Sequence, residues 1–135
     1  ALVINKINPN IKLTSGLDAL KSDKNIKIWL PSKHLSKSND FKRNWNSTSD
    51  SVACWLLRKL DAKGVLFIKS LSFEKKYSLK IKTLQKKKIL DRNITMYLKK
   101  NSCLKIVGPE ITSILKNEKK WSNVIKQTKK IKYDQ

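Results

Sequence analysis

Acid–base chemistry in this chain would have to centre on His34, which is the single histidine. Lys33 and Lys37 flank it and could stabilise charge on a phosphate, and Asp40 is the nearest carboxylate that could serve as a second acid or base. These residue types describe a small cationic ribonuclease or toxin. A lone loop histidine is more often incidental, because catalysis needs a second group positioned beside it. The sequence therefore favours a protein that is not an enzyme.

The two cysteines, Cys54 and Cys103, could in principle form a disulfide or bind a metal. Each lies among apolar residues, so we interpret both as small buried side chains. A structural metal site would need at least two more ligands, and no such set is present, so neither a metal nor a cofactor is expected. No phosphate-binding glycine loop, nucleotide fingerprint or nucleophile elbow is found either. We therefore expect no small-molecule substrate.

Positive charge is the dominant chemical feature of the chain. Its 135 residues include 31 Lys and Arg against 10 Asp and Glu, which gives a formal net charge of +21. Self-repulsion at this charge would destabilise an isolated compact state unless a polyanion compensates it. The charge is spread along the whole chain, so nucleic acid is the favoured partner. A membrane span is not expected, because no apolar run reaches the necessary length.

Local clustering selects the candidate RNA-binding residues. The densest basic run is 86–88, and the lysines at 80 and 82 are expected to project from one face of a strand. A tryptophan within RNWN has only polar neighbours and could stack on an exposed base. In a protein of lower net charge, we would interpret these lysine-rich surfaces as solvent-exposed and without a binding role. The full set of candidates is Lys12, Lys42, Arg43, Trp45, Lys80, Lys82, Lys86, Lys87, Lys88, Arg92, Lys99 and Lys100.

The other aromatic residues divide into candidates for contact and candidates for the core. Phe41 stands alone in the same polar loop as Trp45 and could also stack on a base. Trp29, within IKIWL, is expected to pack in the core. Trp55 and Trp121 lie beside apolar helix faces and are expected to be core residues as well.

The distribution of apolar and polar residues divides the chain into two segments. Residues 1–49 are expected to form an irregular basic arm, with an extended stretch over 1–13, a short helix near LDAL, a strand or buried plug at 26–30 and a polar loop after it. Residues 50–135 are expected to form one α+β domain. In chain order this domain should contain a helix over 50–60, strands over 65–73 and 77–84, a basic helical region over 86–101 that is one helix or two short ones, a strand over 103–107 and a helix from 109 to about 131.

This order of elements resembles the prokaryote-type KH arrangement. The text LLRKLDAKGVLFIKSLSFEKKYSLKIKTL, residues 56–84, resembles the small-subunit ribosomal protein three family, the KH-domain protein of the mRNA entry channel. That family also begins with a lysine-hydrophobic-asparagine-proline stretch and a basic-leucine step, and residues 6–9 with residues 12–13 look like a shifted version of it. The resemblance covers the first dozen residues and most of 50–130.

The resemblance implies a KH-like helix-hairpin-helix-strand domain preceded by the irregular arm. It implies a structural constituent of the ribosome that neutralises phosphates of small-subunit rRNA and touches neighbouring ribosomal proteins. KKKILDRN has no glycine where KH domains carry their GxxG loop, so docking on folded rRNA is expected in place of a single-strand grip. The family's C-terminal domain has no recognisable counterpart, which favours a mitochondrial ribosome, with a cytoplasmic location as the alternative. A scaffold subunit that mainly contacts proteins in a large assembly is a further alternative.

Overall fold

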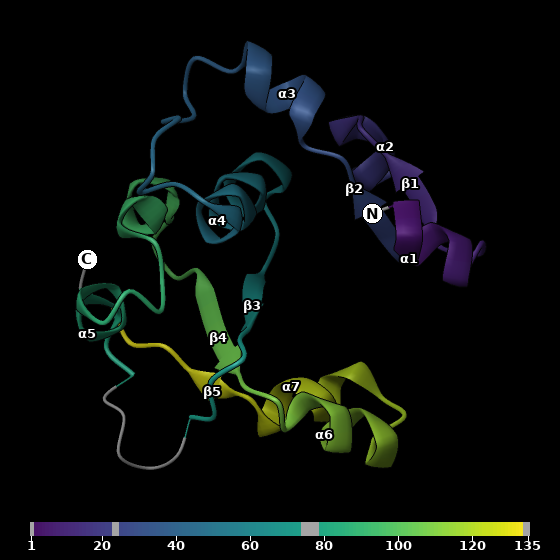
Figure 1. Ribbon diagram of the computed structural model, residues 1–135, viewed down its shortest axis with the longest axis vertical. Helices are drawn as coiled ribbons and strands as arrows, with labels where there is room; N and C mark the ends of the chain where they lie inside the picture. Colours follow the sequence, from purple (N-terminus) through teal and green to yellow (C-terminus); the bar gives the residue numbers. More distant parts are fainter. Residues whose placement is uncertain (1, 23–24, 74–78, 134–135) are drawn as a thin grey trace.

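Helix α4 and a three-stranded sheet form the centre of the structure, a computed structural model that describes residues 2–22, 25–73 and 79–133 (Figure 1). This mixture of helices and small sheets confirms the expected α+β class. The elements in chain order are α1 (Leu2–Ile7), β1 (Lys12–Thr14), α2 (Leu17–Lys21), β2 (Lys27–Trp29), α3 (Ser32–Lys37), α4 (Ser49–Leu60), β3 (Gly64–Ile68), α5 (Ile81–Lys86), the 3-10 helix η1 (Arg92–Tyr97), β4 (Cys103–Val107), α6 (Ile111–Asn117), α7 (Trp121–Gln127) and β5 (Lys129–Lys130).

The central sheet has the order β3-β4-β5. Strands β3 and β4 run parallel, with Gly64 opposite Cys103 and Ile68 opposite Val107, and β5 is antiparallel to β4. A parallel pair needs a long crossover, which here passes through α5 and η1. At position 64 only glycine fits without a shift, because an added Cβ would lie 2.3 Å from the carbonyl oxygen of Cys103. Three predictions are confirmed in this region: the helix before Gly64, the start of the strand after it, and the strand over 103–107.

The main core lies between α4, η1 and one face of the sheet. Cys54 and Trp55 from α4 pack with Phe67 from β3 and Ile94 and Tyr97 from η1, and all five are buried. The buried apolar residues of α4 are Cys54, Trp55 and Leu57, whereas the other members of the expected apolar face, Val52, Ala53, Leu56 and Leu60, are only half-buried. A second, smaller cluster joins the other face of the sheet to α6 and α7 through Val107, Ile111, Ile114 and Val124, with Leu66 packed against it.

The expectation of an irregular first segment is wrong for residues 2–37. Residues 2–7 form α1 where an extended stretch was expected, and β1 pairs in parallel with β2. The amide of Asn8 still donates to the carbonyl of Ile4, and Pro9 follows, so local helical bonding ends at the predicted turn. The short helix near LDAL and the strand at 27–29 are confirmed. Pairing between β1 and β2 joins residues 15 positions apart, which local patterning does not reveal.

The predicted hairpin after α4 is not formed by the described residues. Residues 74–78 lie outside the described part of the chain, and only Lys80 makes an isolated bridge, with Lys132. From Ile81 onward the chain is helical, so Lys80 and Lys82 do not share a strand face. The pattern YSLKIKTL fits both periods: Ile81 and Leu84 are buried at helical spacing. Strand β4, rather than the next segment of chain, occupies the position beside β3.

The two other expected helical regions, 86–101 and 109–131, are each broken into shorter elements. Residues 86–101 contain the last residue of α5, a turn and η1, which agrees with two short pieces, and Leu90, Ile94 and Tyr97 point inward as expected. The single helix expected from 109 to 131 is instead α6, a break, α7 and the short strand β5. Glu118 adopts an extended backbone at the break. The break turns the second piece so that Val124 is buried while Trp121 is 59% exposed.

Candidate nucleic-acid interface

A network of hydrogen bonds, which we call the polar web, joins the loop before α4 to the turn before η1. The two segments are more than 40 positions apart in the sequence. The amide of Asn93 donates to the carbonyl of Asn46 over 3.2 Å. The side-chain Nδ2 of Asn93 donates to Asn44 Oδ1 over 3.0 Å and to Ser47 Oγ over 2.7 Å. Because one side chain bonds two points of the loop, residues 44–47 are held at a defined position beside the turn.

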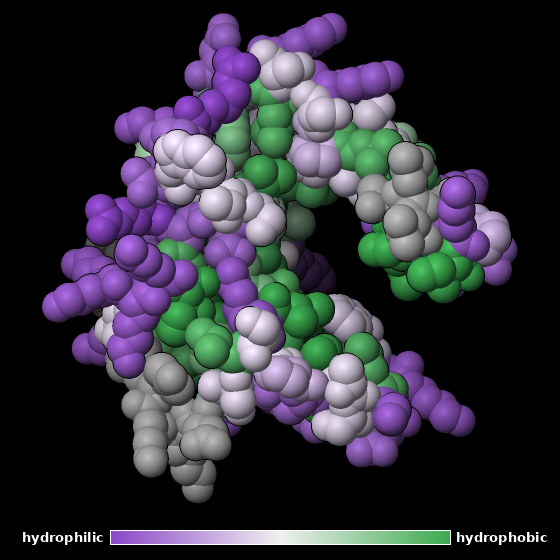
Figure 2. All heavy atoms as spheres, in the orientation of Figure 1, coloured by the Kyte–Doolittle hydropathy of each residue, from purple (hydrophilic) through white to green (hydrophobic). Residues whose placement is uncertain are grey.

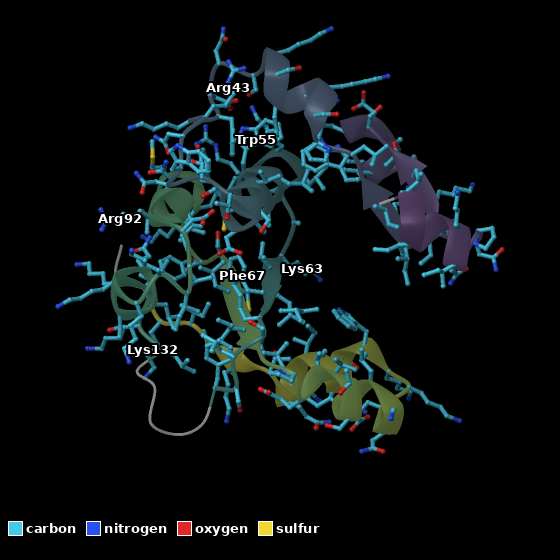
Figure 3. All side chains as sticks on the ribbon, in the orientation of Figure 1. Arg43, Trp55, Lys63, Phe67, Arg92 and Lys132 are labelled. Carbon is cyan, nitrogen blue, oxygen red and sulfur yellow. The ribbon has the colours of Figure 1, made fainter. Side chains whose placement is uncertain are left out.

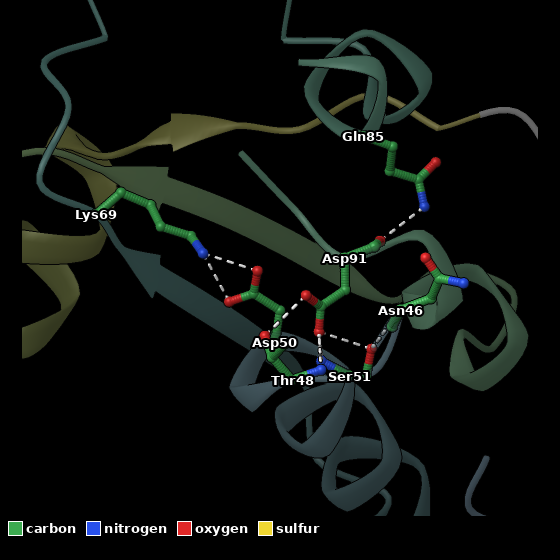
Figure 4. Close-up of polar contacts among 7 residues, drawn as sticks. All are labelled: Asn46, Thr48, Asp50, Ser51, Lys69, Gln85 and Asp91. Atoms are coloured by element: carbon green, nitrogen blue, oxygen red, sulfur yellow. Dashed lines mark hydrogen bonds and ion pairs between the residues drawn. The ribbon is translucent and has the colours of Figure 1, made fainter. Parts of the chain in front are cut away.

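Asp91 is the centre of this web (Figure 4). Its carboxylate accepts hydrogen bonds from the amide and hydroxyl of Thr48 over 2.6 and 2.7 Å, and from the amide and hydroxyl of Ser51 over 3.0 and 2.8 Å. The amide of Ser51 is one of the free donors at the start of α4, so Asp91 caps this helix from a distant part of the chain. Thr48 itself makes no side-chain capping bond.

These bonds decide the charge state of Asp91. Burial opposes ionisation, but the hydrogen bonds from Thr48 and Ser51 outweigh it, and the pKa of the carboxyl lies below its ordinary value. A second acid nearby, Asp50, is bonded through both oxygens to Lys69 Nζ at 2.7 and 2.8 Å. The negative charge at the start of α4 is therefore already compensated inside the protein.

A hollow of about 470 Å³ opens beside this web. It is lined by Trp45, Asn46, Gln85, Lys88, Leu90, Asp91 and Arg92. Gln85 Nε2 donates to the carbonyls of Asp91 and Arg92 over 3.0 and 2.9 Å, which joins α5 to the turn. Trp45 is 98% exposed. Three of the predicted binding residues, Trp45, Lys88 and Arg92, are thus brought together around one concave surface.

A second hollow lies along the same helix. It has a volume of about 590 Å³ and is lined by Lys82, Thr83, Lys86 and Lys87. Since α5 supplies Gln85 to the first hollow and Lys86 to the second, the two hollows occupy neighbouring sides of one helix. Hydrophilic side chains gather over this part of the surface (Figure 2), and Arg92 projects from it (Figure 3). We call the exposed residues Lys82, Lys86, Lys87, Lys88 and Arg92 the basic face.

All twelve predicted binding residues are exposed, but they do not form one cluster. Lys12 belongs to β1, far from α5 in Figure 1. Lys42 and Arg43 lie in the loop before α4, where the Arg43 guanidinium donates to the carbonyl of Ser36 in α3 and the amide of Lys42 donates to the hydroxyl of Tyr97 in η1. Lys99 is paired with Asp61 at 2.6 Å, beside Lys100. The sequence did not single out Asn46 or Gln85, because no local pattern distinguishes an uncharged amide that lines a distant hollow.

Two aromatic residues differ from expectation. Phe41 is 7% exposed and stacks on Tyr97 at 5.5 Å, so it is a core residue and is not available to a base. Trp121, expected in the core, is largely exposed at the start of α7, where the break after α6 turns it away from the sheet. Trp55 is buried and Trp29 stacks on it at 5.9 Å, as expected.

Asp40, the carboxylate nearest to His34 in the sequence, is engaged by other side chains. Asp40, the proposed partner of His34, accepts from Trp55 Nε1 and Ser38 and is paired with Lys59 at 2.6 Å. His34 lies at 6.4 Å from the ring of Trp29, centroid to centroid. Cys54 is buried, Cys103 is half-buried, and both are free thiols. Within the described ranges no group of three potential metal ligands is found, and no helix is long and apolar enough to cross a membrane.

Comparison of the chain with protein-family models, with curated proteins and with solved structures finds no match.

Proposed function

We propose that this protein is a noncatalytic structural constituent of a small ribosomal subunit, in a mitochondrial ribosome, where it binds rRNA by neutralising phosphates. The observation that carries the proposal is the basic face. Five cationic side chains lie exposed on α5, the following turn and η1, while the neighbouring carboxylates of Asp50 and Asp91 are bonded within the protein. A surface of this kind attracts a phosphate backbone and gains affinity through the release of counterions.

The resemblance to the KH-domain protein of the small subunit gives the proposal its specific form. The order helix, strand, helix, short helix, strand from α4 to β4 agrees with part of the KH arrangement, and it departs from that arrangement where the second strand of the hairpin was expected, because residues 81–86 form α5. The missing glycine in KKKILDRN agrees with docking on folded rRNA, because the basic run follows a helix rather than a close-approach loop. Neighbouring ribosomal proteins would then contact other parts of the surface.

Salt dependence of RNA binding tests this function. We expect affinity for a small-subunit rRNA fragment to fall steeply with salt. Replacing Lys86, Lys87 and Lys88 together by alanine should lower the slope of log affinity against log salt by about 2–3, since each phosphate contact contributes about 0.9. The matched control removes three other exposed lysines, Lys116, Lys119 and Lys120, which lie in α6 and in the segment between α6 and α7. This control should leave the slope near the wild-type value.

Two results would favour the alternatives. A flat salt response combined with binding to a purified protein would favour a scaffold subunit. Cleavage of the RNA that disappears in His34→Ala would favour a cationic ribonuclease. Co-sedimentation of the protein with mitochondrial small subunits from the native source would test the assignment to the ribosome directly, and its absence there would count against it.

A further inference from the structure

We propose that the hollow beside Trp45 binds one unpaired nucleotide of RNA, with the base stacked on the indole ring and the phosphate held by Lys88 and Arg92. This inference rests on the proposed RNA-binding function. It adds a defined recognition site to a function that otherwise needs only distributed charge.

Trp45 is suited to stacking because its ring is almost fully exposed. At 98% exposure it is the most exposed large hydrophobic residue among those described. Within the described part of the chain its side chain makes no hydrogen bond or ring contact. A tryptophan contributes nothing to packing in such a place, whereas its π face can stack on any base.

The backbone that carries Trp45 is held in place before any ligand arrives. Asn44, Asn46 and Ser47 bond to Asn93, and Thr48 bonds to Asp91. A preorganised loop reduces the entropy lost on binding. The web that caps α4 therefore also presents the residue at the tip of this loop, Trp45, in a defined position.

The charges around the hollow favour an anion. Lys88 follows α5 in a left-handed conformation (φ 58°), and its amide donates to the carbonyl of Gln85, which fixes the direction of the turn. Arg92 is held through its own carbonyl by Gln85 Nε2. The acid in the hollow, Asp91, directs its carboxylate to α4 through four hydrogen bonds. Lys88 and Arg92 are therefore available for charge-assisted bonds to a phosphate.

The remaining polar groups could contact the base edge. Gln85 uses its Nε2 for two carbonyls, which leaves its Oε1 as an acceptor, and the side chain of Asn46 carries both a donor and an acceptor. The bases of a continuous RNA duplex are stacked and paired, so only an unpaired nucleotide can enter the hollow. A volume of about 470 Å³ lies in the range of small-ligand pockets.

The test compares a short blunt RNA duplex with the same duplex carrying one bulged nucleotide, by fluorescence anisotropy with the intact protein. We expect the wild type to prefer the bulged RNA by roughly tenfold or more. Trp45→Ala should lose this preference and bind both RNAs like the blunt duplex. Trp45→Phe should retain most of it, because a phenyl ring also stacks. The matched control Trp121→Ala, which removes the other exposed tryptophan, should behave like the wild type.

The salt slopes add a second readout. Trp45→Ala should keep the wild-type slope for the bulged RNA, since stacking releases no counterions, whereas Lys88→Ala and Arg92→Ala should each lower it by about 1. Equal binding of both RNAs by the wild type, or an unchanged preference in Trp45→Ala, would overturn the nucleotide site and leave the proposed rRNA-binding function intact. Absence of salt-dependent binding to any RNA would overturn the proposed function and this inference with it.

Discussion

Trp45 and Trp55 are ten positions apart in the sequence, yet one lies on the surface and the other in the core. The indole of Trp55 stacks on Trp29, contacts Phe41 edge-on at 6.2 Å, donates to Asp40 and lies 5.2 Å from Lys59 Nζ. Trp45 instead lies at the rim of a hollow whose lining is mostly polar or charged. The same residue type thus supports stability in one region and is available for recognition in the other.

The two regions are joined at the start of α4. Asp91 caps this helix, which carries Trp55, and the bonds to Thr48 also hold the loop that carries Trp45. We call the Trp55 surroundings the aromatic core and the Trp45 surroundings the stacking hollow. Substitutions in the aromatic core should therefore change folding, and substitutions in the stacking hollow should change binding. A substitution at Asp91 should affect both.

The largest effect is expected in the aromatic core. Trp55→Ala removes a residue that is 2% exposed and leaves a cavity against Trp29 and Phe41. We expect the free energy of unfolding to fall by about 3–5 kcal/mol, measured by urea denaturation followed by circular dichroism. Trp45→Ala is the matched control and should change it by less than about 0.5 kcal/mol. Equal losses in the two variants would contradict the division into core and hollow.

An intermediate effect is expected at Asp91. Asp91→Asn keeps the shape of the side chain but replaces one acceptor oxygen with a donor that faces the Thr48 and Ser51 donors. We expect a loss of about 1–2 kcal/mol in the free energy of unfolding, because a partly buried capping bond is removed. Affinity for the bulged RNA should fall as well, since the loop that carries Trp45 loses its attachment.

The same variant should change the response to acid. The folded-state pKa of Asp91 lies below its unfolded value, against the opposing effect of burial, because of the bonds from Thr48 and Ser51. Its contribution to stability is therefore present above the unfolded pKa, about 4, and is lost as the pH falls through the lower folded pKa. Urea midpoints measured from pH 7 downward should fall less steeply in Asp91→Asn. Asp40, whose pKa is lowered mainly by its bond to Lys59, should preserve part of the slope.

The smallest effect is a difference in chemical reactivity between the two cysteine thiols of the wild-type protein. Burial, followed by the charges of Asp50 and Asp91, raises the pKa of Cys54 to about 12. At pH 8 we expect iodoacetamide to modify the half-buried Cys103 and to spare Cys54, as read by mass spectrometry of peptides. Rapid modification of Cys54 in the wild type would mean that the aromatic core opens readily, which would weaken the contrast between the two regions.

The sequence by itself determined the parts of this protein that depend on local pattern. The apolar spacing of residues 52–60 predicts α4, and the apolar run CLKIV predicts β4. The glycine after the helix was expected to cap its end, but Asp61 takes the left-handed conformation there (φ 53°) and Gly64 begins β3. Composition predicts a basic surface, and the polar neighbours of Trp45 predict its exposure. Side-chain period and solvation act within a few residues, so they can be read directly from the order of residues.

Only the tertiary structure decided which distant residues meet. Phe41 has polar neighbours in the sequence, but Trp55 and Tyr97 supply an apolar environment for it in the fold. Residues 81–86 fit a strand or a helix by pattern, and in the structure they form α5 while β3 pairs with the distant strand β4. Asp91 finds its four donors 40 and 43 positions away, and Lys88 meets Trp45 at the same hollow. Such pairings depend on the whole packed chain because their free energy is gained only after long loops have closed.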